Sequence, residues 1–289
     1  MSKPEGRGHV TAPGQAVVVG ATGTIGQAVV RRLTRRGLPV LAVARGQADL
    51  DELASASDLV TACPADIGSN EAIQVIGSAL TGSVRMAVFA AGLPVRGSAD
   101  TIDPDALAIG SNIKVGGLLR LLHAVRDRLE PGSRLVTFAG SLGLEPRAHE
   151  AGPGAVNAAV FNLMRQISLL YGPRGVTTHT LSPGPADTPR LRRIVAAVAA
   201  ERGAAEEDVW QEYVAQNSLG RLPTANELAW AVELLLDPEA DLLHGSVLYL
   251  DAGGHRGIHL KAGRRAGTWS VRSKFLAEPA PSRSRAAGR

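Results

Sequence analysis

A glycine-rich turn between an apolar run and a helix-like segment constrains this chain more than any other feature. Gly20, Gly23 and Gly26 follow the apolar residues 16–19 and open the segment 25–36. Glycines at these positions allow a tight turn, a close approach of the backbone to a pyrophosphate, and a helix N-terminus that faces the phosphates. The turn therefore predicts a dinucleotide site. The alternative is an α/β turn that needs its glycines only for packing.

Short apolar runs alternate with helix-like segments along the chain, which is the pattern of βαβ units in a parallel sheet. The expected strands are residues 16–20, 40–44, 60–63, 86–90, 135–139, 176–181 and 246–250. The expected helices are residues 25–36, 69–80, 111–129, 154–170 and 224–236, with one or two more in 191–216. We therefore predict a single-domain, Rossmann-like, doubly wound α/β fold with helices on both faces of the sheet.

Charge and composition divide the 289 residues into a body and two polar ends. Residues 1–14 are rich in Pro and Gly, and we expect them to be flexible. Residues 255–289 hold nine Lys and Arg against one acidic residue, so we expect a basic, partly disordered tail. The body, residues 15–254, is mildly acidic, because residues 1–254 hold 22 Lys and Arg against 26 Asp and Glu.

Several classes of protein are disfavoured by what the chain lacks. Cys63 is the only cysteine, which excludes a disulfide framework and a cysteine-rich metal site. The first residues contain no apolar stretch typical of a signal peptide, and no apolar run reaches the roughly 20 residues of a membrane span. We expect a cytoplasmic protein with no membrane partner. The tail has too few aromatic residues for a nucleic-acid stacking platform, so we also expect no nucleic-acid partner.

The end of the second expected strand indicates the type of dinucleotide. A carboxylate there would bind the ribose 2′-hydroxyl of NAD, and a basic residue would favour the 2′-phosphate of NADP. The chain has Arg45 at this point and no acidic residue before Asp49, which favours NADP(H) over NAD(H). A solvated arginine at a strand end is the alternative. Asp66, after the third strand, would lie near the adenine amino group or cap the helix that follows.

Several motifs together resemble the short-chain dehydrogenase/reductase family. After the glycine turn come Phe89-Ala-Ala-Gly92, Asn112 in the next long helix, and Ser141 in Gly-Ser-Leu-Gly after the fifth strand. The segment 181–188, Leu-Ser-Pro-Gly-Pro-Ala-Asp-Thr, is similar to the family's segment over the nicotinamide, and residues 219–222 and 250–254 resemble its last helix entry and last strand. The resemblance spans residues 15–254.

This resemblance implies a nicotinamide cofactor, a small-molecule carbonyl or hydroxyl substrate, and a homo-oligomer, either a dimer or a tetramer. It implies Ser141 and Asn112 as catalytic residues, and residues 190–217 as a lid insertion over the substrate pocket. It implies cofactor contacts from Gly20, Thr22, Gly23, Thr24, Ile25, Gly26, Arg45, Asp66, Ile67, Ala90, Ala91, Gly92, Asn157, Pro183, Gly184 and Thr188.

The chain departs from the family at its acid–base pair. The family has a tyrosine about a dozen residues after the serine and a lysine four residues later, and those positions hold Pro153 and Asn157 here. No Tyr-x-x-x-Lys occurs anywhere, because the residues four after Tyr171, Tyr213 and Tyr249 are Gly175, Asn217 and Gly253. A positioned general acid is worth about 10²–10⁴ in rate, so ordinary carbonyl reduction should be disabled while cofactor binding partly survives.

Three side chains are candidates for the missing acid. His149, beside Glu150 in the loop before Pro153, would titrate near neutral pH if it faced the pocket; an exposed loop histidine is the alternative. His179 in the sixth strand is expected to be packed in the core, and Tyr213 in the insertion would serve only if it pointed inward. Lys114 lies two residues from Asn112, so on a helix it should face elsewhere.

Two functions remain open at this stage. One is a divergent enzyme that performs atypical redox chemistry, or elimination, isomerisation or cyclisation in which a cofactor takes no chemical part. The other is a catalytically inactive, cofactor-binding sensor or a partner subunit of an active relative. A basic tail that binds an acidic partner is a third and weaker hypothesis.

Overall fold

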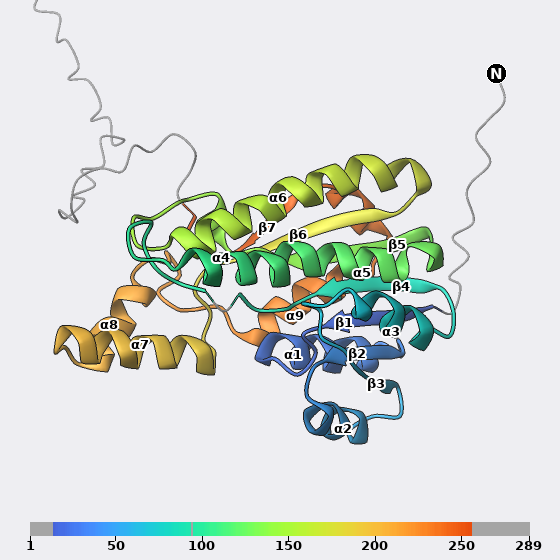
Figure 1. The fold of residues 1–289 in the computed structure, drawn as a ribbon, viewed down its shortest axis with the longest axis horizontal. Coiled ribbons are helices and arrows are strands. Elements are labelled where there is room, and N and C mark those ends of the chain that lie inside the picture. Colours follow the sequence, from blue (N-terminus) through green and yellow to red (C-terminus); the bar gives the residue numbers. More distant parts are fainter. Residues whose placement is uncertain (1–13, 94, 256–289) are drawn as a thin grey trace, which may run out of the picture. The chain divides into compact units, whose positions relative to one another are not determined.

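The computed structural model describes residues 14–93 and 95–255, and these form a seven-stranded parallel sheet in the order β3-β2-β1-β4-β5-β6-β7 (Figure 1). The predicted doubly wound α/β fold is confirmed. The strands are β1 Gln15–Val19, β2 Val40–Ala44, β3 Val60–Pro64, β4 Val84–Phe89, β5 Leu129–Phe138, β6 Thr177–Pro183 and β7 Val247–Leu250. The strand order reverses between β1 and β4, and ligands of such sheets bind beyond the carboxyl ends of the strands at this point.

Helices cover both faces of the sheet. The longer ones are α1 Thr24–Arg35, α2 Gln47–Ser55, α3 Glu71–Ala79, α4 Pro104–Ser111, α5 Gly117–Val125, α6 Ala151–Tyr171, α7 Pro189–Arg202, α8 Glu206–Val214 and α9 Ala225–Leu234. Short 3-10 turns lie at Arg126–Arg128, Ser141–Gly143, Gly172–Arg174 and Pro238–Leu243. Among the described residues, no helix combines the length and apolar character needed to cross a membrane.

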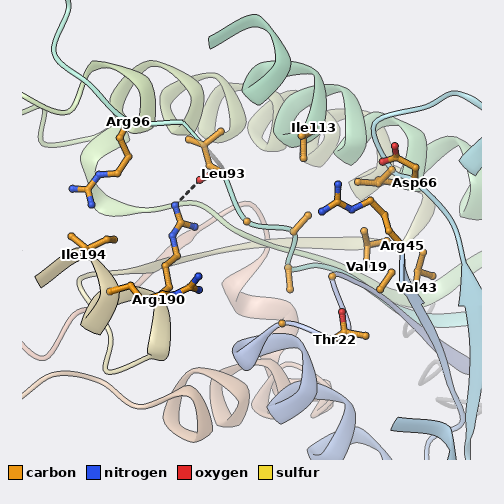
Figure 2. A pocket seen from close by; sticks show the side chains of 18 of the residues that line it. Val19, Thr22, Val43, Arg45, Asp66, Leu93, Arg96, Ile113, Arg190 and Ile194 are labelled. Atoms are coloured by element: carbon orange, nitrogen blue, oxygen red, sulfur yellow. Dashed lines mark hydrogen bonds between the residues drawn. The ribbon is translucent and has the colours of Figure 1, made fainter. Parts of the chain in front are cut away.

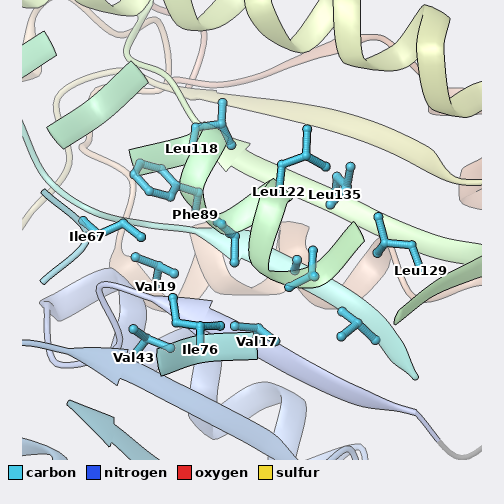
Figure 3. Close-up of a cluster of buried hydrophobic side chains, with 14 of the residues drawn as sticks. Val17, Val19, Val43, Ile67, Ile76, Phe89, Leu118, Leu122, Leu129 and Leu135 are labelled. Atoms are coloured by element: carbon cyan, nitrogen blue, oxygen red, sulfur yellow. The ribbon is translucent and has the colours of Figure 1, made fainter. Parts of the chain in front are cut away.

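Alternate residues of each central strand belong to two separate cores. Val17 and Val19 of β1 pack with Phe89 and with α3, α5 and α6 on one face (Figure 3). Ala16 and Val18 pack with α1, α2 and α9 on the other face. Burial on both faces explains why the strands are almost continuously apolar.

The segment between β4 and β5 differs from the single helix expected over residues 111–129. It consists of α4, a π-helical turn over Asn112–Gly116 (η1) and α5, and β5 already begins at Leu129. The Arg120 guanidinium donates a hydrogen bond to the Asn112 carbonyl, at 3.0 Å from Nη1, inside the widened turn. A π-turn changes the side-chain register relative to a regular helix, and such turns are frequent at functional sites.

The insertion contains two helices, α7 and α8, with a small apolar core of their own. Leu191, Val195 and Ala199 of α7 pack against Val209 of α8 and against Leu222. Gly203 ends α7 in the left-handed conformation, with φ +63°. The predicted flexible residues 1–14 and basic tail 255–289 lie almost wholly outside the described residues, so both stay predictions.

Candidate functional site

The three glycines of the β1–α1 turn are required for different reasons. Gly20 has φ +81°, and a Cβ there would lie 2.9 Å from the Ala90 backbone. A Cβ on Gly26 would lie 2.0 Å from the Gly20 carbonyl oxygen. Gly23 is the N-cap of α1 and donates its N–H to that carbonyl, at 3.1 Å. Gly20 and Gly26 therefore serve the packing of strand and helix. The amides of the first helical turn have no partners within the helix.

A cavity of about 930 Å³ lies beyond the carboxyl ends of β1, β2, β3 and β4 (Figure 2). Nine of the predicted cofactor residues line it: Gly20, Thr22, Gly23, Arg45, Asp66, Ile67, Ala90, Ala91 and Gly92. It is also lined by Ile113 of η1 and by α7 residues including Arg190, Arg193 and Glu201. Its glycine-turn backbone and open shape fit a dinucleotide.

Arg45 and Asp66 lie at one end of this cavity (Figure 2). Arg45 has no ion-pair partner in the part of the chain that the structure describes, and Asp49 lies in the first turn of α2 and does not line the cavity. The Oδ1 of Asp66 accepts a hydrogen bond from the Gly68 amide at 2.9 Å, which stabilises the turn before α3. Because α3 begins only at Glu71, Asp66 does not cap the helix.

A second cavity, of about 270 Å³, adjoins the first, and both are lined by Arg96, Arg190 and Ile194. The other residues around it include Ile25, Gly140, Ser141, Leu142, Arg147, Glu150, Pro153, Pro183, Gly184, Thr188 and Tyr213. Four predicted cofactor residues, Ile25, Pro183, Gly184 and Thr188, thus lie here, while Thr24, Gly26 and Asn157 line neither cavity. The predicted catalytic Ser141 shares this space with Pro153 at the start of α6.

The two positions that the resemblance assigns to the acid–base pair lie near the start of α6. Pro153 lines the second cavity and offers no proton. Asn157 is buried, and its Nδ2 donates to the Pro153 carbonyl at 2.8 Å within α6. The Asn157 amide is therefore engaged with the helix backbone and is not brought to the cavity as a cofactor ligand.

Asn112 does not lie at the site where the sequence placed it. Its side chain is exposed, its Nδ2 donates to the Gly68 carbonyl at 2.8 Å, and its Oδ1 accepts from Arg120 at 2.7 Å. It lines neither cavity. The π-turn instead directs Lys114 inward, toward the end of β4. Lys114 and Asn112 face in different directions, as predicted. It is Lys114, however, and not Asn112, that contacts a residue of the larger cavity, Ala91.

Lys114 is 5% exposed, and its ammonium donates to the Ala91 carbonyl at 2.9 Å. Its Nζ also lies 5.5 Å from the centroid of the Phe89 ring. Burial, and then the positive charge of Arg190, lower the pKa of Lys114 to about 8. Lys114 thus links η1 to Ala91, which lines the cavity. Sequence reasoning missed it because the motif placed Asn112 at the site, and a residue two positions along a helix then had to face elsewhere.

The structure separates the other candidates for the missing acid. His149 is exposed and lines neither cavity, whereas its neighbour Glu150 lines the second cavity and pairs with Arg96 at 2.8 Å. His179 is fully buried in β6, beside Thr177 Oγ1 at 2.9 Å. Burial, and then Arg134, lower the pKa of His179 to about 4, which agrees with a neutral core residue.

Tyr213 of α8 lines the second cavity, so the one candidate in the insertion does face the predicted substrate space. Two described groups there, the Tyr213 hydroxyl and the Glu150 carboxyl, are of the types that take part in general acid–base catalysis. Among the described residues, no cluster of three or more His, Cys, Asp or Glu side chains is placed to hold a metal ion.

Comparison with known proteins agrees with this geometry. The family model described as enoyl-(acyl carrier protein) reductase matches residues 20–255. The chain belongs to the short-chain dehydrogenase/reductase family. The resemblance inferred from the motifs is thereby confirmed.

The curated relatives cover most of the chain at modest identity. The short-chain reductase protein NovJ of Streptomyces niveus is 26% identical over 82% of this chain and 92% of its own. A cis-4-hydroxycyclohexanecarboxylate dehydrogenase of Sinomonas cyclohexanicum is 29% identical over 85% of this chain and 98% of its own. A short-chain dehydrogenase family protein from Francisella tularensis superposes with a TM-score of 0.78 at 18% identity, covering 84% of this chain and 99% of its own, and it supports the fold.

Proposed function

We propose that the chain binds NADP(H) in the larger cavity and a small organic carbonyl or hydroxyl compound in the adjoining one, and acts as a divergent enzyme. The observation that carries this proposal is the pair of cavities that meet beside the glycine turn. Family membership supports a nicotinamide cofactor in general terms. When bound, that cofactor would supply or accept a hydride.

The preference for NADP(H) rests on charge at the end of β2. Arg45 lines the cavity without an ion-pair partner among the described residues, and no carboxylate of that segment reaches the cavity. A free guanidinium favours a phosphate, which it binds through two parallel hydrogen bonds. A 2′-hydroxyl offers no matching charge.

The chemistry in the second cavity differs from that of typical relatives. Ser141 can donate a hydrogen bond to a substrate oxygen. Among the described lining groups, the Tyr213 hydroxyl can donate a proton and the Glu150 carboxylate can accept one, whereas Pro153 can do neither. Tyr213 approaches from α8, whereas the family's tyrosine lies at the position of Pro153. The substrate must therefore sit differently, or the reaction must be one that needs no proton at that point, such as elimination, isomerisation or cyclisation.

A second function, an inactive cofactor-binding sensor or partner subunit, is favoured by one observation. Neither position of the usual pair holds a residue that transfers a proton: Pro153 lines the cavity, and the Asn157 amide donates to the helix backbone. The expected dimer or tetramer and the cytoplasmic location also stay predictions.

Turnover separates the two functions. The purified full chain is incubated with NADPH and a panel of aldehydes and ketones, and with NADP⁺ and the matching alcohols, while the cofactor absorbance is followed. A divergent oxidoreductase turns over at least one compound, and Tyr213→Phe or Glu150→Gln slows that turnover about 10²-fold or more. Tyr249→Phe, whose side chain lies at neither cavity, serves as the control. Cofactor binding without turnover, with no product detected by mass spectrometry, favours the sensor.

A further inference from the structure

Arg190 occupies the junction of the two cavities. It lines both of them, and its Nη2 donates a hydrogen bond to the Leu93 carbonyl at 2.6 Å. A Cβ built on Gly92 would lie 3.3 Å from the Nη1 of Arg190. Figure 2 shows its side chain rising from α7 toward Leu93, at the end of the larger cavity opposite Arg45.

The positive charges around this junction are not balanced. Arg96 pairs with Glu150 at 2.8 Å, and Arg192 pairs with Asp187 at 2.9 Å. Arg190 and Arg193 have no carboxylate partner in the part of the chain that the structure describes. Partial burial of the guanidinium, followed by the charges of Arg96 and Arg193, lowers the pKa of Arg190. Like charges here destabilise one another unless an anion is present.

Composition does not explain this concentration of arginines. Residues 1–254 hold more acidic than basic residues, yet the second cavity is lined by Arg96, Arg147 and Arg190 against the single carboxylate of Glu150 among described residues. The first turn of α7 contains no acidic residue, although helix N-termini favour negative side chains. The charges of Arg190 and Arg193 are therefore destabilised both by the N-terminus of α7 and by the neighbouring arginines. Such an arrangement is typical of a site that binds an anionic ligand.

We propose that Arg190 binds a carboxylate of the substrate, so that the substrate is a small organic acid that also carries the reacting carbonyl or hydroxyl group. The proposal rests on the proposed function. Arg190 lies in the same cavity as Ser141, which places a carboxylate and a hydrogen-bonded oxygen of one compact molecule within that cavity. The phosphates of the cofactor are the other possible source of an anion, but the glycine turn and Arg45 lie away from Arg190 in the cavity (Figure 2).

Binding of a simple carboxylate tests this proposal. Benzoate and its uncharged counterpart benzamide are titrated into the full chain by calorimetry, with and without saturating NADPH. We expect benzoate to bind saturably and at least about tenfold more tightly than benzamide, because a charge-assisted hydrogen bond is worth more than a neutral one. Arg190→Gln should lower the affinity for benzoate at least about tenfold, and Arg190→Lys should lower it less. Arg192→Gln is the control, because Arg192 lies two residues from Arg190, is ion-paired and lines neither cavity; it should leave the affinity for benzoate unchanged.

The variants also distinguish the source of the anion. Arg190→Gln should leave the Kd for NADPH within about twofold; a large loss of NADPH binding with benzoate unaffected would assign Arg190 to a cofactor phosphate and overturn the proposal. Failure of the wild type to bind benzoate under either condition would overturn it as well. If benzoate binding depends on Arg190 but NADPH does not bind at all, the carboxylate site stands and the proposed function fails.

Discussion

Individual glycines in the β1–α1 turn are constrained by neighbouring backbone as much as by any ligand. The Gly26 position has no room for a Cβ, which would lie 2.0 Å from the Gly20 oxygen, whereas Gly77 in α3 has ordinary space, with its nearest atom at 3.6 Å. Gly26→Ala should therefore lower the free energy of unfolding by at least about 2 kcal/mol, as overpacking does.

Urea denaturation of Gly26→Ala and Gly77→Ala measures this difference. Gly77→Ala is the matched control, because it also replaces a helical glycine, and it should be neutral or slightly stabilising. Equal stabilities for the two variants would show that the turn can open without cost.

A second residue-scale prediction concerns the buried ammonium of Lys114. Its pKa is lowered to about 8 in the folded protein, while an unfolded lysine titrates near ~10.4. Between these values the unfolded chain binds more protons than the folded one, so stability must rise with pH from about 8 to about 10.4. The penalty for the buried charge, of order 3 kcal/mol, is fully present below that window.

Lys114→Met tests the assignment, because methionine keeps much of the stem and removes the charge. The difference in unfolding free energy between wild type and Lys114→Met, measured by urea denaturation at several pH values, should shift in favour of the wild type as pH rises from 8 to 10. A difference that does not vary with pH would show that the ammonium of Lys114 is not desolvated.

Elements with a regular period were predictable, and those with a local irregularity were not. The strand–turn–helix unit from β1 to α1 follows from an apolar run, three glycines and an amphipathic segment, and the cavity formed there contains most of the predicted cofactor residues. The π-turn η1 has no signature in the sequence, since a one-residue change of register leaves the apolar pattern almost unchanged. Asn112 was placed at the site on the resemblance of its motif alone, and Lys114, two residues along the helix, was placed away from the site as a consequence.

The second cavity was only partly predictable for a related reason. The order of the motifs predicts Ser141, Thr188 and a proline in place of the usual proton donor at position 153. Three separate loops and helices contribute Glu150, Arg96 and Arg190. Side chains that meet only in the tertiary fold carry no shared spacing in the sequence. The exposed position of His149 depends on the conformation of its loop and could not be read from its neighbours in the chain.

At the element scale, one buried arginine ties β5 to the end of α9. Arg134 is 2% exposed; its Nε donates to the Leu235 carbonyl at 2.8 Å, and its Nη2 pairs with Asp241 at 2.7 Å. Arg134→Met should destabilise the fold by about 3 kcal/mol, because it leaves buried carbonyl groups without donors.

The control for this prediction is Arg202→Met, which breaks an exposed ion pair with Glu212 and should cost less than about 1 kcal/mol. Thermal and urea denaturation of both variants give the comparison. A cost for Arg134→Met no larger than that for Arg202→Met would contradict the role given to the buried arginine.

At the scale of the whole molecule, a mildly acidic body carries a cationic site. The larger cavity is lined by four arginines, Arg45, Arg96, Arg190 and Arg193, against two carboxylates, Asp66 and Glu201, which leaves a net positive charge around a space open to solvent (Figure 2). Such a field attracts anionic ligands and weakens with added salt. The cavity beyond the carboxyl ends of the strands is thus present in this chain, while Pro153 stands where the resemblance to the family places the usual proton donor.

The claim that this cavity is an NADP(H) site is tested most directly by titrating the wild-type chain with NADPH and NADH and following the fluorescence of the bound cofactor. We predict one saturable site with NADPH bound at least about tenfold more tightly than NADH. That preference should be lost in Arg45→Asp but not in Arg128→Asp, which changes an exposed arginine directly before β5, at the amino ends of the strands. Binding of neither cofactor, or tighter binding of NADH by the wild type, would contradict the account.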